Sequence, residues 1–292
     1  MGEIFFSIII PTYNRSHFLS GTINSIIRQD FKDLEIIVVD DGSIDNTKDL
    51  VNEFVKNDSR IKYFYQKNSE RAIARNNGAS KATGKFLIFL DSDDYFSSDD
   101  HLKKLHEYLK NNTEKFGLYF TGAMLSNGET INTSRDYTIE ELNQIDFFLK
   151  ESVVPARVCL PKTLFDFFEF DNDCILVEDT VLWTAIKEKH PIYYVPIHSV
   201  TYFLHEDNSV NIKKTNAYLK RLNGLKKLFD EYDVGKKIPK KSKKYHLNNC
   251  YYGISEFYLN NNRFIRSKLW IIKSLFKYPH LDTKHKIKIL FN

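Results

Sequence analysis

Short hydrophobic runs alternate with amphipathic stretches over the first hundred residues of the chain. Apolar residues such as Leu19, Ile23 and Ile26 recur at helical spacing between the runs, which predicts helices over 16–29, 50–55 and 71–83. Strands and helices that alternate at this spacing predict an α/β fold, with a Rossmann-like, mostly parallel sheet and helices on both faces. The predicted strands are residues 5–10, 34–39, 61–65 and 85–90.

The pattern loosens after about residue 100. Helices are predicted near 102–109 and 140–150, after Pro161 and from Glu178; strands are predicted at 117–125, 153–160 and 193–195, with a hairpin turn at Asn127-Gly128 that leads into 129–132. A lysine-rich break follows near 235–244. The predicted division is an α/β domain over 1–235, with halves at 1–98 and 99–235, and a basic, aromatic-rich helical region over 236–292.

Composition narrows the compartment in which the chain is expected to act. The three cysteines, Cys159, Cys174 and Cys250, are far apart and lack metal-ligand spacing, which indicates free thiols in a reducing compartment. No apolar run approaches the ~20 residues of a membrane span. The N-terminus lacks the basic start and the cleavage site of a secretory leader. We therefore expect a cytoplasmic location.

Polar residues follow three of the predicted strands directly. Pro11-Thr12-Tyr13-Asn14-Arg15 follows the first, Asp40-Asp41-Gly42-Ser43 the second, and Asp91-Ser92-Asp93-Asp94 the fourth. In parallel α/β sheets, ligands bind beyond the carboxyl ends of the strands. The three segments are therefore expected to meet in one crevice.

The carboxylates of Asp91, Asp93 and Asp94 lie at the end of a buried strand, where like charges repel and are poorly solvated. A divalent cation would neutralise them. Oxygen ligands suit Mg²⁺ or Mn²⁺, which take few carboxylates and complete their shell with water and phosphate oxygens. The alternative is an acidic turn that caps the helix starting near Asp99.

With Ala74-Arg75-Asn76 and Glu178-Asp179 added, these segments resemble the family 2 glycosyltransferases. Members of that family are inverting, metal-dependent enzymes with the GT-A nucleotide-diphospho-sugar transferase fold. The resemblance is strong over 5–94, weaker to about Ser209 and absent beyond.

The resemblance implies a site for a nucleotide-sugar donor after the first, second and fourth strands. A carboxylate such as Asp41 can accept the ring N–H of uracil or thymine, which favours a UDP- or dTDP-sugar. The alternatives are a turn and helix cap for the second segment, core packing for Tyr13, and surface ion pairs with Glu70 or Asp93 for the two helical arginines. The implied donor-binding residues are Pro11, Thr12, Tyr13, Arg15, Asp40, Asp41, Arg71, Arg75, Asp91 and Ser92.

The resemblance also implies a metal site and a catalytic base. The DXD-type segment supplies Asp91, Asp93 and Asp94 as metal ligands, and His205 lies where relatives sometimes carry a histidine that faces the metal or diphosphate. Asp179, with Glu178 beside it, is the candidate base for the acceptor hydroxyl. The alternatives are a structural histidine and ordinary first-turn helix acids.

Charge is distributed unevenly along the chain. Residues 236–292 hold 14 Lys and Arg against two acids, a net charge of +12, and the remainder carries −8. Basic, aromatic-rich helices can lie on anionic membranes, here at the inner face of the cell membrane. The alternative is a helical appendage that packs its aromatics and leaves its lysines in water.

The expected function is transfer of a sugar from a UDP or dTDP donor to a hydroxyl of a glycan or lipid-linked oligosaccharide, in bacterial surface polysaccharide synthesis. Sugar nucleotidyltransferases share the architecture but need a glycine-rich loop after the first strand, and the segment 11–15 has no glycine. Nucleic-acid binding through the basic region is opposed by the acidic remainder and the lack of a recognition motif. A transferase that binds donor without catalysis stays open. Donor sugar, linkage and oligomeric state have no readable signal.

Overall fold

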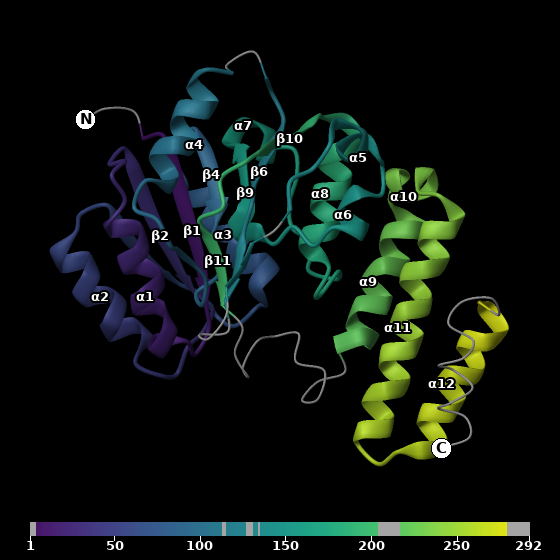
Figure 1. Ribbon diagram of the computed structural model, residues 1–292. Helices are drawn as coiled ribbons and strands as arrows, with labels where there is room; N and C mark the ends of the chain where they lie inside the picture. Colours follow the sequence, from purple (N-terminus) through teal and green to yellow (C-terminus); the bar gives the residue numbers. More distant parts are fainter. Residues whose placement is uncertain (1–3, 113–114, 127–130, 134, 204–216, 279–292) are drawn as a thin grey trace. The chain divides into compact units, whose positions relative to one another are not determined.

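The computed structural model describes residues 4–112, 115–126, 131–133, 135–203 and 217–278, and Figure 1 shows their helices and strands. The chain forms two compact units, each described here by itself. The first unit comprises Met1–Gln144, Ser152–Asn172 and Ile186–Leu204; the second comprises Ile145–Glu151, Asp173–Ala185 and His205–Asn292. The predicted boundary after residue 235 falls inside α10 (Asp233–Lys237) of the second unit.

A seven-stranded, mostly parallel sheet forms the centre of the first unit, in the order β10-β6-β9-β4-β1-β2-β3. β9 runs antiparallel to both of its neighbours, while β10 is parallel to β6. This arrangement confirms the predicted α/β fold. The strands are β1 (Phe6–Thr12), β2 (Leu34–Asp40), β3 (Ile61–Tyr65), β4 (Phe86–Phe89), β6 (Leu118–Thr121), β9 (Val158–Pro161) and β10 (Ile192–Val195).

Helices cover both faces of this sheet because both faces of β1 and β2 are apolar. Ile8 and Ile10 of β1 share one core cluster with buried residues of α1 (Ser16–Ile27), α2 (Thr47–Asn57) and α4 (His101–Lys110). Ile9 points to the opposite face, where Gly78 of α3 (Arg71–Lys81) packs against it. The alternation of β1 side chains thus places α3 on its own side of the sheet.

A second, four-stranded sheet contains β5 (Tyr95–Phe96), β11 (Val200–Phe203), β7 (Met124–Ser126) and β8 (Ile131–Thr133), in that order. The predicted strand 117–125 is wrong as one strand, because β6 and β7 belong to different sheets. β7 and β8 form the predicted antiparallel hairpin. The predicted turn residues Asn127-Gly128 lie outside the described residues.

Two further predictions in this region need correction. The helix expected over 140–150 is two short helices, α5 (Ile139–Asn143) and α6 (Phe147–Lys150). The strand expected from Val153 begins only at Val158, because Pro155–Arg157 forms a 3-10 turn with the proline at its start. The expected short helix after Pro161 is α7 (Lys162–Phe165).

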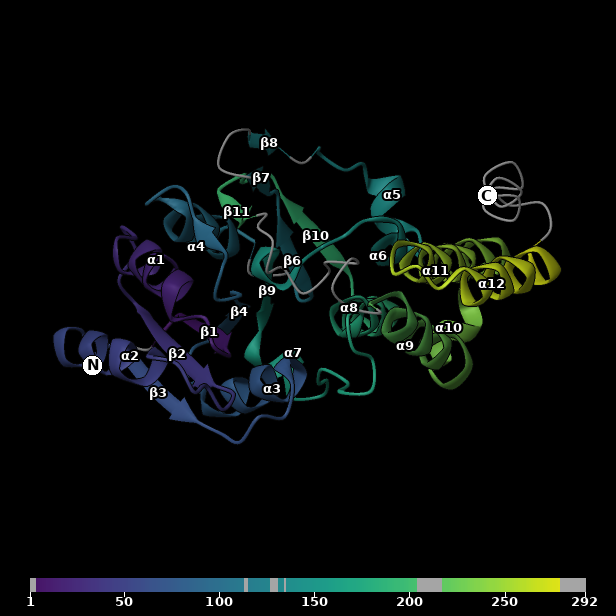
Figure 2. The same cartoon turned by 90° about the horizontal axis from the view of Figure 1, so that it is seen from below.

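The second unit is helical, and Figure 2 shows three of its helices side by side: α9 (Ala217–Glu231), α11 (Lys240–Asn260) and α12 (Phe264–Lys277). Its core contains Val177, Leu225 and Ile254, with the buried Cys174 and Cys250. All three cysteines are free, as predicted, and the structure shows that all three are buried. Within the described residues, no helix is both long and apolar enough to cross a membrane.

Candidate active site

The loops after β1 and β2 are tied together by hydrogen bonds. The Asn14 N–H donates to Ser43 Oγ at 2.9 Å, and the Ile44 N–H donates to Asn14 Oδ1 at 2.8 Å. The Asp41 N–H donates to the Thr12 carbonyl at 2.8 Å. Asn14 has a φ of 52°, a left-handed conformation that asparagine tolerates better than most residues. Two segments about thirty positions apart therefore meet beyond the sheet edge, as predicted.

The Asp41 side chain is held by the segment that precedes α3. Its Oδ1 accepts hydrogen bonds from Gln66 Nε2 at 2.7 Å and from the Ser69 N–H at 2.8 Å. Burial raises the pKa of Asp41, and the hydrogen bonds from Gln66 and Ser69 oppose that rise. Glu70, the N-cap residue of α3, adopts a φ of 73°, so the backbone beside Asp41 is strained.

Asp40 fulfils the structural alternative that the sequence left open. Its Oδ1 accepts from the Ser43 N–H at 2.8 Å, which closes the turn, and its Oδ2 accepts from the Tyr63 hydroxyl at 2.7 Å. The side chain is buried. A donor-binding role for Asp40 stays a prediction, whereas its role in the turn is visible.

The acidic segment after β4 is joined to the other parts of the crevice by two ion pairs. Arg15 Nη1 lies 2.6 Å from Asp93 Oδ2, and Arg75 Nη2 lies 2.6 Å from Asp91 Oδ1. The Arg75 side chain is only 1% exposed and its guanidinium lies 5.2 Å from the centre of the Phe170 ring, whereas Asp91 is 28% exposed, so the pair is partly buried. The loop after β1, helix α3 and the acidic segment thus converge.

Asp94 is the most deeply buried carboxylate of the cluster. Its Oδ1 accepts from the Phe203 N–H at 3.3 Å, and its Oδ2 has no hydrogen-bond partner among the residues that the structure describes. Burial, followed by the charges of Asp91 and Asp93, raises the pKa of Asp94 well above its usual range. A buried carboxylate oxygen without a hydrogen-bond donor or a cation beside it lowers the stability of the fold.

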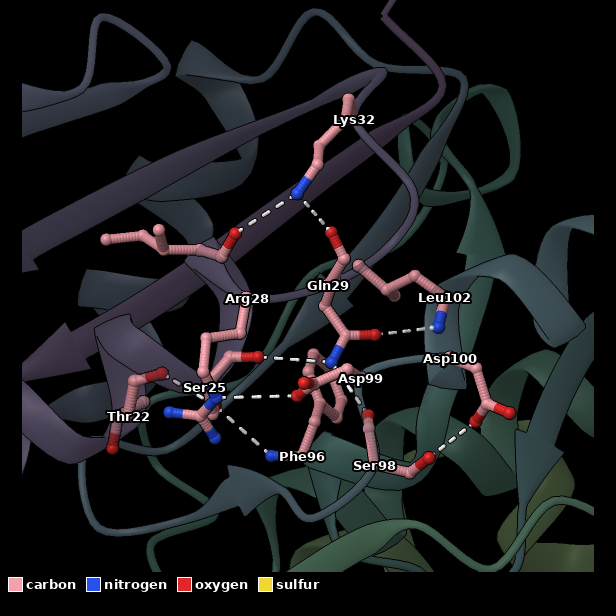
Figure 3. A network of polar contacts seen from close by, with 11 residues as sticks. Thr22, Ser25, Arg28, Gln29, Lys32, Phe96, Ser98, Asp99, Asp100 and Leu102 are labelled. Carbon is pink, nitrogen blue, oxygen red and sulfur yellow. Dashed lines mark hydrogen bonds and ion pairs between the residues drawn. The ribbon is translucent and has the colours of Figure 1, made fainter.

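Helix α1 positions the acidic segment and the residues that follow it. Thr22 Oγ1 donates to the carbonyls of Ser92 at 2.9 Å and Asp94 at 2.8 Å. One turn and two turns further on, Ser25 and Gln29 bond the backbone between Phe96 and Leu102, as Figure 3 shows. Polar side chains of α1 and of the residues just after it therefore hold the acidic segment and the backbone that follows it.

Two residues near the cluster bear on its electrostatics. Burial, followed by the charges of Asp94, Asp91 and Asp93, raises the pKa of Tyr202 to about 12, while Arg71 opposes that rise. Tyr202 in β11 and Arg71 at the start of α3 therefore lie within electrostatic reach of the cluster. Sequence reasoning missed Tyr202, because nothing in its local pattern distinguishes it from a packing tyrosine.

The remaining residues predicted from the first loop differ in accessibility. Tyr13 is 47% exposed, so the alternative of core packing is wrong and its ring is available to a ligand. Pro11 and Thr12 end β1 and are buried; Thr12 Oγ1 has no hydrogen-bond partner within the described part of the chain.

The structure describes the two predicted base residues but not the predicted histidine. Glu178 and Asp179 open α8 (Glu178–Lys189), and Asp179 Oδ1 accepts from the Thr180 N–H at 2.6 Å. Their first-turn position fits the structural alternative, and they belong to the second unit, so their catalytic role stays a prediction. His205 lies outside the described residues.

The acidic cluster offers oxygen ligands but an incomplete metal shell. Among the described residues, no group of three or more His, Cys, Asp or Glu side chains could hold a metal ion by itself. Mg²⁺ and Mn²⁺ need only one or two carboxylates when water and phosphate complete the shell. The buried, unpartnered Asp94 Oδ2 is an atom that such a cation would satisfy. The residues present therefore fit a cation that is shared with a diphosphate.

Comparisons with a family profile and with curated proteins show what this chain is similar to. The sequence profile described as "Glycosyl transferase family 2" matches residues 7–153. The GalNAc(5)-diNAcBac-PP-undecaprenol beta-1,3-glucosyltransferase of Campylobacter jejuni is 30% identical over 220 residues, 73% of this chain and 69% of that protein. The UDP-Glc:alpha-D-GlcNAc-diphosphoundecaprenol beta-1,3-glucosyltransferase WfgD of Escherichia coli is 32% identical over 197 residues, 66% of this chain and 73% of that protein.

Solved structures agree on the architecture. The crystal structure of S. aureus TarS 1–349 in complex with UDP-GlcNAc superposes with a TM-score of 0.65 at 21% identity, and covers 93% of this chain and 79% of that one. At this identity the likeness shows the GT-A fold alone. The profile match over half of the chain and the similarity to the C. jejuni enzyme together show that this chain belongs to the family 2 glycosyltransferases.

Proposed function

We propose that the chain transfers a sugar from a UDP-sugar to a hydroxyl of a lipid-linked glycan, with inversion at the anomeric carbon. The observation that carries this proposal is the junction of three segments at one sheet edge, made by the Asn14–Ser43 hydrogen bond and the Arg15–Asp93 ion pair. The acceptor class follows from the relatives' names, since both act on sugars carried by undecaprenol diphosphate. A dTDP-sugar is the alternative donor.

In this proposal the first two segments hold the nucleoside. Tyr13, which is half exposed, stacks on the pyrimidine, and Asp41 accepts the ring N–H that uracil and thymine share. Cytosine has no such N–H, so the site would prefer uracil or thymine to cytosine. Hydrogen bonds from Gln66 and Ser69 hold the Asp41 carboxylate in place before the donor arrives.

The third segment and the arginines handle the diphosphate. Asp91, Asp93 and Asp94 would hold Mg²⁺ or Mn²⁺, which when bound stabilises the negative charge of the departing nucleoside diphosphate. Arg71 and Arg75, one turn apart on α3, supply fixed positive charge on the same side. Because Arg15 and Arg75 are ion-paired with Asp93 and Asp91, cation binding competes with those pairs.

Inversion requires a base on the acceptor side of the sugar. We assign that role to Asp179, with Glu178 beside it: Asp179 takes the proton from the acceptor hydroxyl as its oxygen attacks the anomeric carbon. Membership of the transferase family removes the support for a sugar nucleotidyltransferase.

A thermal-shift screen tests the proposal. UDP-glucose, dTDP-glucose and CDP-glucose are compared with and without Mn²⁺, for the native chain and for Asp93→Asn. The expected result is stabilisation by the uridine or thymidine donor that depends on Mn²⁺ and disappears in Asp93→Asn. Asp99→Asn is the matched control, because Asp99 lies on the same segment but pairs with Arg28 in solvent.

Two outcomes of this screen would contradict the proposal. One is equal stabilisation by all three donors, which would remove the role of Asp41 in choosing the base. The other is a Mn²⁺-dependent shift that survives Asp93→Asn unchanged, which would place the cation elsewhere.

A further inference from the structure

Helix α12 of the second unit exposes a line of large apolar side chains. Ile265, Leu269, Ile272 and Phe276 are 80%, 52%, 41% and 86% exposed, respectively. Their spacing of four, three and four positions places them on one stripe along the helix. Soluble proteins seldom leave such a continuous apolar stripe in water without a binding role.

The opposite side of α12 buries small polar residues instead. Ser267 and Ser255 of α11 approach within 2.8 Å through their hydroxyls, and Ser274 Oγ donates to Asn248 Oδ1 at 2.7 Å. Ile271 lies between the two serines and is fully buried. Two hydroxyls of α12 therefore pack inside the unit, together with Ile271 and the partly buried Trp270, while four other large apolar side chains of the helix face solvent.

Basic residues flank the exposed stripe on both sides. By helical position, Arg266 and Lys273 lie on one flank and Lys268 on the other, and α12 contains no Asp or Glu. The Lys273 amine lies 4.5 Å from the centre of the Trp270 ring, and the Arg266 guanidinium lies 5.8 Å from that of Tyr258. These contacts hold the positive charges beside the stripe.

We propose that this face of α12 binds an anionic phospholipid surface. The apolar stripe enters the headgroup region, and Arg266, Lys268 and Lys273 contact the lipid phosphates. An uncharged apolar partner would leave the positive charges unpaired, and a zwitterionic membrane would attract them less than an anionic one. A second copy of the chain fits less well, because a symmetric contact through this face would bring like charges together. The proposal confines the membrane hypothesis for residues 236–292 to one helix face.

Vesicle sedimentation of the 292-residue chain tests the membrane proposal without any substrate, so its result does not depend on the proposed donor or acceptor. The protein is mixed with vesicles of phosphatidylglycerol and phosphatidylcholine, or of phosphatidylcholine alone. Binding is expected to the anionic vesicles, to fall with added salt, and to weaken more than about tenfold in the Lys268→Glu/Lys273→Glu variant. Lys103→Glu/Lys110→Glu, on exposed positions of α4, is the charge control.

A second variant, with its own matched control, tests the contribution of the apolar stripe to vesicle binding. Ile265→Gln/Phe276→Gln should lose anionic vesicle binding, whereas Ile139→Gln/Phe167→Gln should retain it, since those residues are as exposed, at 78% and 84%. Equal binding by all four double variants, or no binding by the native chain, would overturn the proposal. So would sedimentation equilibrium showing a dimer that only Ile265→Gln/Phe276→Gln dissociates, because the face would then be a contact between copies.

Discussion

Asp40 and Asp41 are adjacent in sequence but differ in what holds them. Asp40 has its two carboxylate oxygens occupied by Ser43 and Tyr63, whereas Asp41 accepts hydrogen bonds from the segment before α3 and burial raises its pKa. We predict that Asp41→Asn weakens UDP binding about tenfold or more and changes stability little, while Asp40→Asn destabilises the fold by about 1–3 kcal/mol. Calorimetric titration with UDP and thermal melts separate the two effects; the reverse pattern would exchange their roles.

Asp94 provides a second prediction for a single residue. Because burial and two neighbouring carboxylates raise the pKa of Asp94, ionising it opposes folding when no cation is present. Asp94→Asn should therefore melt no lower than the native protein in EDTA, yet lose transferase activity by about 100-fold or more in Mn²⁺. A variant that keeps its activity would show that Asp94 does not help to hold the cation.

Helices α1 and α3 each contain one internal glycine, and the two differ in surroundings. A Cβ on Gly78 would lie 2.4 Å from Ile9 Cγ2, whereas a Cβ on Gly21 would meet nothing within 4 Å. We predict that Gly78→Ala destabilises the protein by about 1–3 kcal/mol through overpacking, and that Gly21→Ala stabilises it by about 0.5–1 kcal/mol through helix propensity. Urea denaturation measures both; destabilisation by Gly21→Ala would refute this packing account.

The start of α4 makes stability depend on pH. His101 is buried, stacks on Phe96 and bonds Ser199 Oγ through Nδ1 at 2.8 Å, and burial lowers its pKa from the usual 6.5 to about 3. The unfolded chain then binds more protons between those pH values, so this stability is complete above about pH 6.5 and is lost as pH falls.

The slope expected from His101 is at most about 1.4 kcal/mol per pH unit. His101→Gln should flatten the stability curve between pH 6.5 and 4, while His17→Gln, at an exposed position, should leave the slope unchanged. Urea melts at a series of pH values measure this. An unchanged slope in His101→Gln would mean that other groups set the acid sensitivity.

At the scale of elements, the sequence predicts best where each element carries its own signal. The mostly apolar segments of β1, β2 and β3 predict the ends of those strands to within two residues. Prediction from the sequence fails where the choice of neighbouring strand decides the structure. No local sequence signal marks the break between β6 and β7, although the two strands join different sheets. The sequence predicts that the loops after β1, β2 and β4 share a crevice, but not which arginine pairs with which aspartate. Arg15 and Asp93, for example, are 78 positions apart.

For the whole molecule, the two units could not be read from the sequence. The second unit collects Ile145–Glu151 and Asp173–Ala185 with the C-terminal helices, so its core is assembled from separated segments. The uneven charge of the sequence identifies only residues 236–292 of the second unit as distinct, because α9 has no strong net charge. The proposed base, Asp179, and the proposed membrane-binding face of α12 both belong to this unit.

Locating the donor in the folded molecule tests the central claim most directly. Crystals soaked with UDP-glucose and MnCl₂ would be measured for difference density and for anomalous scattering from manganese. We expect uracil within hydrogen-bonding distance of Asp41 and a manganese peak beside the carboxylates of Asp91, Asp93 and Asp94. Nucleotide density away from the loops after β1 and β2, or manganese at a different cluster of acids, would contradict it.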